Sequence, residues 1–436
     1  MEWTIILTLF GSFAVMLALS VPISFAIAIA TLITISMSMP SDMAITVITQ
    51  KLASGLDNFA LLAIPFFILA GNIMNRGGIA RRLIALAKVL GAKLPGSLFH
   101  CNVLANMMFG SISGSAVASA AAMGGIMSPL QKKDGYDPEI SAAVNITSCP
   151  TGLLIPPSNT LIVYSLVSGG TSISALFLAG YVPGILMGLG IMLVAGFIAK
   201  RRNYPVEALP PCKEVLWKFL DAMPSLLLIV IVIGGIIAGI FTATEASAIA
   251  VVYTFILAVV IYREVKLKEL PVIIMNSGIT TAIVLLLIGT SSGMSWAMAN
   301  ADIPFLIQDA LNYISDSPIV IMAVIVGILL VIGTFMDMTP AVLIFTPIFL
   351  PIASDIGVDP VHFGIIMTFS LCIGICTPPV GSALFVGCSV GGVSIDKVLK
   401  PLIPFFIVMI LTLLLVTFIP DLSLILPKVL LDYMPL

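Results

Sequence analysis

Apolar stretches long enough to cross a membrane recur along the whole chain, separated by short polar or basic loops. A membrane-spanning helix needs about 20 apolar residues. The first two stretches, residues 4–20 and 23–39, are joined at a proline and predict a helical hairpin. The remaining continuous spans are predicted at residues 59–75, 174–199, 221–241, 244–262, 272–299 and 401–420. The pattern therefore predicts an all-α polytopic membrane protein.

One apolar segment is interrupted in an unusual way, because residues 145–159 contain the three prolines Pro150, Pro156 and Pro157. Proline removes a backbone donor from the helical ladder, and a bilayer supplies no water to replace the lost hydrogen bonds. Such a break is tolerated only against protein or a cavity, which is how many transporters hold an ion at mid-membrane depth. A proline-kinked packing helix is the alternative for this stretch taken alone.

A second copy of the broken segment follows 222 positions later. The shift carries Gly152, Pro156, Pro157, Gly169, Gly170, Ser172 and Ile173 onto Gly374, Pro378, Pro379, Gly391, Gly392, Ser394 and Ile395. Upstream, it carries Pro129, Gly135, Asp137 and Pro138 onto Pro351, Gly357, Asp359 and Pro360. Two broken helices at corresponding positions of two halves indicate the binding site of a transporter.

Each broken helix is preceded by an apolar stretch that is itself interrupted near its middle. Residues 95–129 are interrupted by the glycines and serines of 110–115, and lysines stand at both ends. Both ends should then lie on one face of the membrane, so this stretch is predicted to be a re-entrant hairpin. The corresponding stretch of the second half, residues 317–351, is interrupted at 333–340.

The basic residues also predict how the two halves are oriented. No Lys or Arg occurs from residue 269 to 396, whereas basic residues bracket the first hairpin. By the positive-inside rule, the first hairpin enters from the cytoplasm and the second from outside, which makes the halves inverted repeats. Between residues 76 and 94, basic residues at helical spacing predict an amphipathic helix in the membrane interface.

These elements divide the chain into six predicted segments. They are N-terminal scaffold helices at 1–75, the interfacial helix at 76–94, a first transport-domain repeat at 95–173, further scaffold helices at 174–300, a second transport-domain repeat at 301–396, and a C-terminal helix and tail at 397–436.

Composition supports a membrane protein and excludes several other classes. Of the 436 residues, 60% are hydrophobic and 9% are charged, whereas a soluble chain carries about 25% charged residues. The net charge of −2 and the lack of a basic cluster with interleaved aromatics argue against a nucleic-acid partner. Glu2 stands where a signal peptide would carry basic residues, so the first apolar span is predicted to remain in the mature protein as a membrane helix. The six cysteines lack CxxC spacing, and His100 and His362 lack metal-ligand spacing, so no catalytic metal is expected.

Seven short motifs, spread in order over almost the whole chain, resemble those of one transporter family. They are PFFILAG at 65–71, GSISGSA at 110–116, DGYDP at 134–138, IPPSN at 155–159, GIFTATEA at 239–246, DMTP at 337–340 and TPPVG at 377–381. The chain resembles the large membrane subunit (M subunit, DctM-like or SiaM-like) of tripartite ATP-independent periplasmic (TRAP) transporters.

The resemblance implies a fold of the ion-transporter superfamily, in which a scaffold holds a transport domain that moves as an elevator. It implies a protein of the bacterial inner membrane, where membrane lipids surround it. The implied activity is uptake of an organic acid together with Na⁺, and the protein is expected not to be an enzyme. The implied partners are a small four-helix membrane subunit (Q subunit), expected as a separate chain, and a periplasmic substrate-binding protein (P subunit). Family substrates include C4-dicarboxylates, sialic acids, sugar acids and keto acids.

A carboxylate substrate needs positive potential, yet neither hairpin tip nor either broken helix contains Lys or Arg. Half-helix N-termini near Pro157 and Pro379 would supply part of it, and bound sodium ions the rest. One sodium site is predicted from Gly110, Ser113, Gly114, Ser115, Gly152, Ile155 and Pro156. A second is predicted from Gly333, Thr334, Asp337, Gly374, Thr377 and Pro378. Predicted substrate contacts are Ser111, Thr147, Ser148, Asn159, Thr339 and Ser382.

Several of these residues have other interpretations. The small residues of 110–115 also suit close helix packing. Asp337, as an intramembrane carboxylate, is functional by default, with a proton relay or a helix cap as alternatives to a sodium ligand. Glu245 is interpreted as structural, as a cap or a partner within the scaffold.

Two rival functions follow from the same pattern. The nearest is a stand-alone sodium-coupled carboxylate symporter or sodium/proton antiporter of the same superfamily, which would work without a periplasmic binding protein. An intramembrane hydrolase would need paired membrane aspartates or a Ser/His pair, for which the sequence offers no evident candidates.

Overall fold

The N-terminal helices begin and end largely where the apolar pattern changes. The computed structural model describes residues 2–206 and 211–435, and the regular structure in these ranges is helical throughout. The first elements are α1 (Glu2–Ala18), α2 (Ile23–Ser36), α3 (Ser41–Leu56), η1 (Phe59–Leu62) and α4 (Ala63–Arg76). Helices α2 and α3 each begin directly after a proline, Pro22 and Pro40, and α2 packs against α1 as the predicted hairpin.

The next part of the chain forms a hairpin followed by a broken helix. It comprises α5 (Ile79–Gly91), α6 (Ser97–Ser113), α7 (Ala116–Lys133), α8 (Pro138–Ser148), α9 (Thr151–Leu154), α10 (Asn159–Val167) and α11 (Ile173–Arg202). We call α6 and α7 hairpin 1, and residues 155–158 break 1. Hairpin 1 turns at Gly114, which has a positive φ of 62° that glycine adopts without strain.

Three long helices follow. They are α12 (Cys212–Ile237), α13 (Ala243–Phe255), which continues through the π-helical η2 (Ile256–Ile261), and α14 (Leu270–Asn300), which follows η3 (Leu267–Glu269). The predicted structural role of Glu245 is confirmed, because its carboxylate accepts from the Thr242 amide at 2.8 Å while the Thr242 hydroxyl accepts from the Glu245 amide at 3.3 Å. This reciprocal capping box begins α13.

The last part of the chain repeats the hairpin and the broken helix. It comprises α15 (Ile303–Ile314), α16 (Pro318–Phe335), α17 (Met338–Asp355), α18 (Pro360–Gly374), α19 (Ser382–Gly391), α20 (Ile395–Phe418) and α21 (Asp421–Leu431). We call α16 and α17 hairpin 2, and residues 375–381 break 2.

The offset of 222 positions found in the sequence also relates the helix boundaries. It carries the first residues of α7, α8 and α11, at positions 116, 138 and 173, onto the first residues of α17, α18 and α20, at 338, 360 and 395. It also carries α5 onto α15 and α2 onto α13 within a few residues. The two halves of the described chain therefore share one order of helices.

Eight described helices are long and apolar enough to cross a membrane by length and composition. Five of them, Phe59–Arg76, Cys212–Ile237, Ala243–Ile261, Leu267–Asn300 and Ile395–Phe418, match spans predicted from the sequence. Ile173–Arg202 matches a sixth, and the other two are the arms of hairpin 2, Pro318–Phe335 and Met338–Asp355. The all-α polytopic membrane fold is confirmed, and the re-entrant course of the hairpins stays a prediction.

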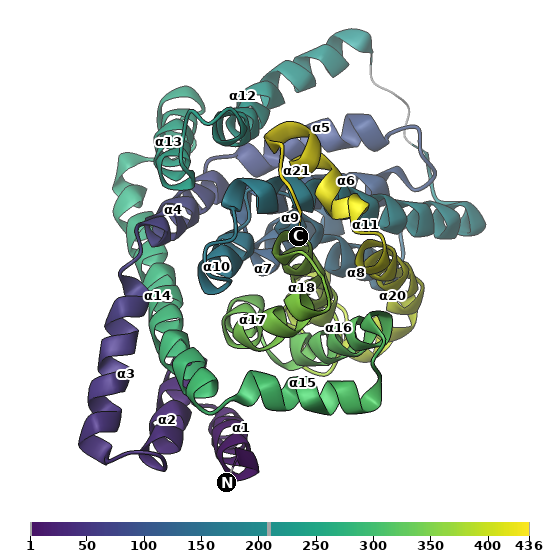
Figure 1. The fold of residues 1–436 in the computed structure, drawn as a ribbon. Coiled ribbons are helices and arrows are strands. Elements are labelled where there is room, and N and C mark those ends of the chain that lie inside the picture. Colours follow the sequence, from purple (N-terminus) through teal and green to yellow (C-terminus); the bar gives the residue numbers. More distant parts are fainter. Residues whose placement is uncertain (1, 207–210, 436) are drawn as a thin grey trace.

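The helices pack as two groups, which Figure 1 shows beside each other. In one group, α14 packs along α2, α3 and α4, and α13 packs against α4 and α12. In the other, the two hairpins and the two broken helices pack against one another and against α11, α20 and α21. Residues 41–56 form the helix α3, which packs along α14 at the outer side of this group (Figure 1).

Helix α11 lies in the second group, although the sequence placed residues 174–300 together in the scaffold. It packs closely on α6, α18, α20 and α21 and makes only slight contact with α12. Its small residues explain the close approach: a Cβ on Gly180 would lie 2.1 Å from the Leu154 carbonyl oxygen, and one on Gly188 would lie 2.4 Å from the Met107 sulfur. Long apolar helices look alike in the sequence, and only packing assigns them to a group.

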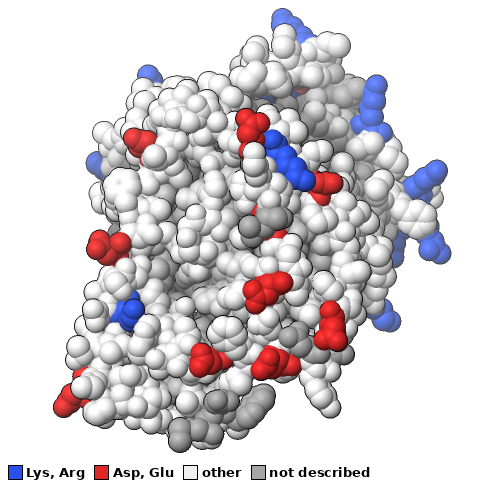
Figure 2. Space-filling model, in the orientation of Figure 1, with Lys and Arg blue, Asp and Glu red and all other residues white. Residues whose placement is uncertain are grey.

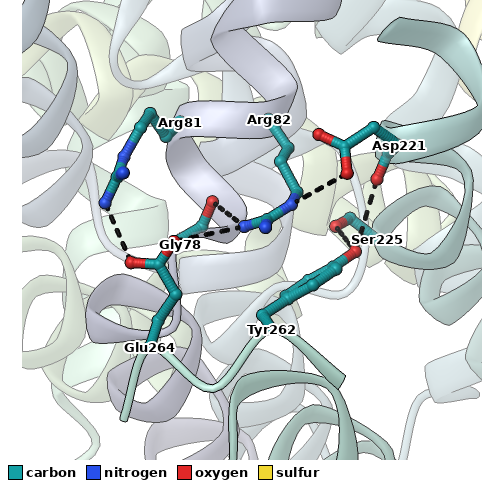
Figure 3. A network of polar contacts seen from close by, with 7 residues as sticks. All are labelled: Gly78, Arg81, Arg82, Asp221, Ser225, Tyr262 and Glu264. Atoms are coloured by element: carbon teal, nitrogen blue, oxygen red, sulfur yellow. Dashed lines mark hydrogen bonds and ion pairs between the residues drawn. The ribbon is translucent and has the colours of Figure 1, made fainter. Parts of the chain in front are cut away.

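Charged groups tie α5 to the first group of helices (Figure 3). The Arg82 guanidinium donates to the Asp221 carboxylate of α12 at 3.2 Å and lies 3.7 Å from the Glu264 carboxylate. It also donates to the Gly78 carbonyl at 3.1 Å and stacks 3.6 Å from the centre of the Tyr262 ring. Arg81 reaches only Glu264, at 2.9 Å. Arg82 therefore joins three chain segments, whereas its neighbour joins two.

The surface charge is unevenly distributed. In Figure 2, acidic side chains are spread over the visible face, and most of the visible Lys and Arg side chains lie along its margin. The C-terminus and α15 lie on this face (Figure 1).

We predict that Arg82→Gln lowers the free energy of unfolding by about 1.5–3 kcal/mol, because hydrogen bonds to charged groups contribute that much when they are partly buried. The Arg82 side chain is 19% exposed, whereas that of Arg81 is 70% exposed. Arg81→Gln is the matched control and should cost at most about 1 kcal/mol. Thermal unfolding of both variants in detergent measures the difference, and equal melting temperatures would refute the anchoring role of Arg82.

Candidate functional site

A cavity of about 900 Å³ lies where the two hairpin tips face the first group of helices. The tips contribute residues 113–118 and 337–340, and the broken helices contribute Leu153, Asn159, Thr160, Val163 and Ile375. The opposite wall comes from α2, α4 and α14. The lining is mostly apolar with a few convergent polar groups, and both the size and this mixture are typical of small-molecule sites.

The tip of hairpin 1 rests on its broken helix through a backbone contact. A Cβ on Gly152 would lie 2.2 Å from the Gly110 Cα, and a Cβ on Gly110 would lie 2.8 Å from the Gly152 Cα. Only glycine at both positions permits this approach. Break 1 follows, because the backbone leaves the helical conformation at Ile155 and re-enters it after Ser158, and the bond between Pro156 and Pro157 is cis.

Hairpin 2 makes the same contact with its own broken helix. A Cβ on Gly374 would lie 2.4 Å from the Gly333 Cα, and a Cβ on Gly333 would lie 2.9 Å from the Gly374 Cα. In break 2, a Cβ on Gly381 would lie 2.6 Å from the Ile375 carbonyl oxygen and 2.8 Å from that of Thr377. The break thus gathers carbonyl oxygens around its turn, which are the kind of group that coordinates alkali cations.

Each break also holds a serine hydroxyl that has no hydrogen-bond partner among the described atoms, Ser158 in break 1 and Ser382 just after break 2. Ser158 is fully buried. The Ser382 hydroxyl lies beside the Asp337 carboxylate without a hydrogen bond that meets normal geometry. Buried polar groups are rarely left unpaired, so these two hydroxyls are candidate contacts for a bound ion or water molecule.

Asp337 is the ionisable residue of the cavity lining, which contains no Lys, Arg or His among the described residues. It occupies the N-cap position of α17, the position of Ser115 in the first half. The Ser115 side chain caps its helix by accepting from the Ala118 amide at 3.2 Å, whereas the Asp337 side chain makes no such capping bond. The Asp337 carboxylate is thus exposed to the cavity.

The predicted site residues fall into three sets in the structure. Lining the cavity are Ser113, Gly114, Ser115, Asn159, Asp337 and Thr339. In the glycine contacts or the breaks are Gly110, Gly152, Ile155, Pro156, Gly333, Gly374, Thr377 and Pro378, with Ser382 just after break 2. The structure does not bring Ser111, Thr147, Ser148 or Thr334 into the lining.

The hydroxyls of this third set hydrogen-bond locally. Thr147 donates to the Ala143 carbonyl at 2.8 Å, and Ser111 donates to the Met108 carbonyl at 2.9 Å. Ser148 is fully buried and accepts from the Asn106 amide at 2.7 Å. Thr334 donates to the Val331 carbonyl at 2.7 Å. Sequence spacing placed these residues near the breaks but did not predict which way each side chain points.

Sequence reasoning missed the polar groups of the opposite wall. Asn72, Asn75, Ser24 and Thr280 line the cavity from α4, α2 and α14. The Asn72 amide donates to the Ser277 hydroxyl at 2.8 Å, which joins α4 to α14. Polar side chains within apolar spans were the available signal, because such residues in a membrane tend to face a cavity or a partner helix.

A helical membrane protein with two glycine-packed hairpins around one cavity of mixed polarity is a membrane transporter by architecture. A family profile described as "Tripartite ATP-independent periplasmic transporter, DctM component" matches residues 10–422, and the chain belongs to this family. It is therefore the large membrane component of a three-part transporter and a multi-pass protein of the bacterial inner membrane.

Two curated relatives and one solved structure are similar to this chain. "Uncharacterized protein YgiK" of Salmonella typhimurium is 61% identical, over 97% of each chain. "Sialic acid TRAP transporter large permease protein SiaM" of Vibrio cholerae is 38% identical, over 88% of this chain and 90% of the relative. The YdaH transporter of Alcanivorax borkumensis shares the fold, with a TM-score of 0.65 at 11% identity over 86% and 88% of the two chains. The predicted family membership is confirmed.

We predict that Gly152→Ala and Gly374→Ala each destabilise the protein by about 1–3 kcal/mol, because the added methyl group would overpack a backbone contact. The matched controls are Gly125→Ala on α7 and Gly327→Ala on α16, where a Cβ would meet nothing within 4 Å. Thermal unfolding in detergent compares the four variants. If the controls lose as much stability as Gly152→Ala and Gly374→Ala, the glycine contacts do not hold the hairpin tips in place.

Proposed function

We propose that this protein carries out sodium-coupled secondary uptake of an organic acid by an elevator mechanism. A periplasmic binding protein delivers the acid, and a small four-helix subunit, encoded as a separate chain, completes the membrane complex. The observation that carries the proposal is the single cavity bounded by both hairpin tips, which has a carboxylate but no fixed cation among its described lining residues.

Charge balance favours sodium as the coupling ion. An anion in a low-dielectric cavity is strongly unfavourable unless a positive charge compensates it. The N-termini of α7, α10 and α17 face the cavity and supply about half a positive charge each. The negative charge of Asp337 offsets the partial positive charge at the N-terminus of α17. Cations that enter with the acid would supply the remaining positive charge. Loading is then favourable only when sodium and substrate bind together.

We place one sodium ion between the tip of hairpin 1 and break 1. The tip offers Ser113 and backbone carbonyls, and break 1 offers the carbonyls around Ile155 and Pro156. The unpartnered Ser158 hydroxyl supports an ion here, because it needs an oxygen-seeking partner or a water molecule. The close contact of Gly110 with Gly152 keeps the two backbones within reach of one ion.

A second sodium ion is placed between the tip of hairpin 2 and break 2. Asp337 supplies a charged oxygen, and Thr377, Pro378 and the carbonyls of break 2 surround the turn. The hydroxyl of Ser382, which lies beside the Asp337 carboxylate, adds a second oxygen at this position. A resident sodium ion would make Asp337 a sodium ligand rather than a proton relay.

The acid itself would bind between the two ions, against Asn159 at the start of α10 and Thr339 of hairpin 2. The amides of Asn72 and Asn75 would contact it from the opposite wall. Ser111, Thr147 and Ser148 stay outside this proposal for the acid, because they do not line the cavity. The relative named for sialic acid supports an organic acid as substrate class.

The packing suggests which parts move. The group formed by the hairpins, the broken helices, α11, α20 and α21 is the proposed transport domain, and α1–α4 with α12–α14 is the proposed scaffold. The cavity lies between the two groups, so sliding one past the other would carry the bound acid across the membrane. By the positive-inside rule, the acidic face of Figure 2 is periplasmic.

We predict that uptake in proteoliposomes collapses without an inward sodium gradient. Each net charge that crosses is driven by about 2.3 kcal/mol per 100 mV, so a negative interior potential should also increase the rate. The assay uses the full complex, with a radiolabelled acid chosen by a thermal-shift screen of the periplasmic partner. Full uptake with a proton gradient alone would overturn the sodium assignment. Full uptake without the periplasmic protein would favour a stand-alone symporter.

We predict that Ser113→Leu and Thr377→Leu each reduce uptake at least about tenfold, a loss of about 1.4 kcal/mol or more in transition-state stabilisation. The leucine removes an oxygen ligand and fills the ion position. Thr46→Leu on α3 is the control, because Thr46 is exposed and bonds only within its own helix. Expression and assembly of all three should match the unmodified complex, and normal uptake by Ser113→Leu and Thr377→Leu would place the ions elsewhere.

A further inference from the structure

A buried carboxamide, Asn106, lies at the centre of hairpin 1. Its Nδ2 lies 2.7 Å from the Ser148 hydroxyl and 3.1 Å from Oδ1 of Asn145, both on α8. It also lies 3.2 Å from Oδ1 of Asn102 on its own helix. Its Oδ1 accepts from the Ser119 hydroxyl of α7 at 2.7 Å. One side chain therefore links both arms of the hairpin to the broken helix.

The network is closed off from solvent and continues into the backbone. Asn106, Ser119 and Ser148 are fully buried, and Asn145 is 3% exposed. The Asn145 amide donates to the Ala120 carbonyl of α7 at 2.9 Å. Asn106 stands one helical turn before Gly110, whose backbone touches Gly152. The carboxamide cluster thus lies directly behind the tip of hairpin 1.

The second half keeps one member of this cluster, since Ser148 corresponds to the buried Ser370, whose hydroxyl donates to the Ile366 carbonyl of its own helix at 2.8 Å. The carboxamides and Ser119 have no polar counterparts. Four residues before Gly333 stands Leu329, where four residues before Gly110 stands Asn106. The offset of 222 carries Ser119 onto Ala341 and Asn145 onto Met367. Leu329, Ala341 and Met367 are all fully buried, so apolar packing fills the space in hairpin 2. In hairpin 2, the Thr346 hydroxyl donates to the Met367 sulfur at 3.2 Å. A thioether sulfur is a weak hydrogen-bond acceptor.

This difference matters inside a membrane. Pulling hairpin 1 away from α8 would leave several amide and hydroxyl groups unpaired where no water replaces their partners. Pulling hairpin 2 away from α18 would separate apolar surfaces, and lipid tails are as apolar as the leucine they would then contact. The two hairpins share a shape and a glycine contact but differ in what their separation costs.

We propose that Asn106 is a positioning residue that locks hairpin 1 to the first broken helix, and that hairpin 2 is the side of the cavity that moves away to admit and release cargo. The inference rests on the proposed transport function only for the identity of the cargo. The first ion position is then preformed, whereas the second is completed when hairpin 2 settles on its broken helix.

Spin labels at matched positions test this inference. Val117 and Thr339 are related by the offset of 222, both line the cavity, and both are partly buried near the start of the second arm of their hairpin. Each is replaced by cysteine and labelled with a nitroxide in a Cys212→Ser background of the assembled complex. Cys212 is the exposed cysteine among the free ones, and the other five are buried.

In sodium-free buffer, the label at Thr339→Cys should show a mobile spectral component at least about twofold larger than the label at Val117→Cys. Asn106→Leu should then increase the mobile component at position 117 and leave that at 339 unchanged. General loosening of the protein would change both labels, so the position-specific response separates positioning from a merely structural role.

A triple variant provides a second test in case Asn106→Leu alone does not fold. Asn106→Leu and Ser119→Ala in hairpin 1, together with Asn145→Met in α8, introduce the apolar residues found at the corresponding positions of hairpin 2 and α18. The label at 117 should then become as mobile as that at 339. Equal mobility of the two labels in the unmodified complex, or an unchanged spectrum at 117 in the triple variant, would overturn the inference. Adding sodium chloride instead of choline chloride tests the proposed function separately: if sodium leaves the 339 label unaffected, the ion assignment fails while the mobility comparison still stands.

Discussion

Backbone that leaves the helical ladder inside a membrane must find its partners within the protein, and this constraint shapes the whole structure. Break 2 meets it partly through local pairs, because the Ile375 carbonyl accepts from the Ala383 amide at 3.1 Å and the Thr377 carbonyl accepts from the Gly381 amide at 3.2 Å. Beside each break, the hairpin tip packs on the broken helix through a pair of glycines, Gly110 with Gly152 and Gly333 with Gly374. A side chain at any of the four positions would hold the backbones apart. The glycine contacts thus determine where the carbonyl-rich loops lie, and both loops come to the edge of one cavity.

The cavity follows from that arrangement, and its chemistry follows from its lining. Two hairpin tips and two breaks present helix N-termini, carbonyl oxygens and hydroxyls, while the opposite wall adds the amides of Asn72 and Asn75. Asp337 is its carboxylate, and no basic side chain is found in its described lining. An anion in such a site needs a compensating positive charge. In the proposed function, coupling between ion and acid follows from this charge balance.

The structure is less symmetric than its repeat. The halves share helix boundaries, prolines and contact glycines. However, Leu329, Ala341 and Met367 stand behind the second tip where Asn106, Ser119 and Asn145 stand behind the first. The capping residues differ in the same way, since Ser115 caps its helix and Asp337 leaves its carboxylate to the cavity. Two copies of one motif thus differ in the polarity of their buried side chains and in the charge at their tips.

The sequence by itself determined the membrane class, most spans, both hairpins, both breaks and the family, because apolar length, proline and glycine act locally and recur at a constant offset. It also identified Ser113, Asn159, Asp337 and Thr339, which line the cavity. Only the tertiary structure decided that α11 packs with the hairpins, that Thr147 and Ser148 point into protein, and that Asn72 and Asn75 complete the site. The physical reason is that a helix shows its composition in the sequence, but which face it turns to a cavity depends on neighbours brought together from distant parts of the chain.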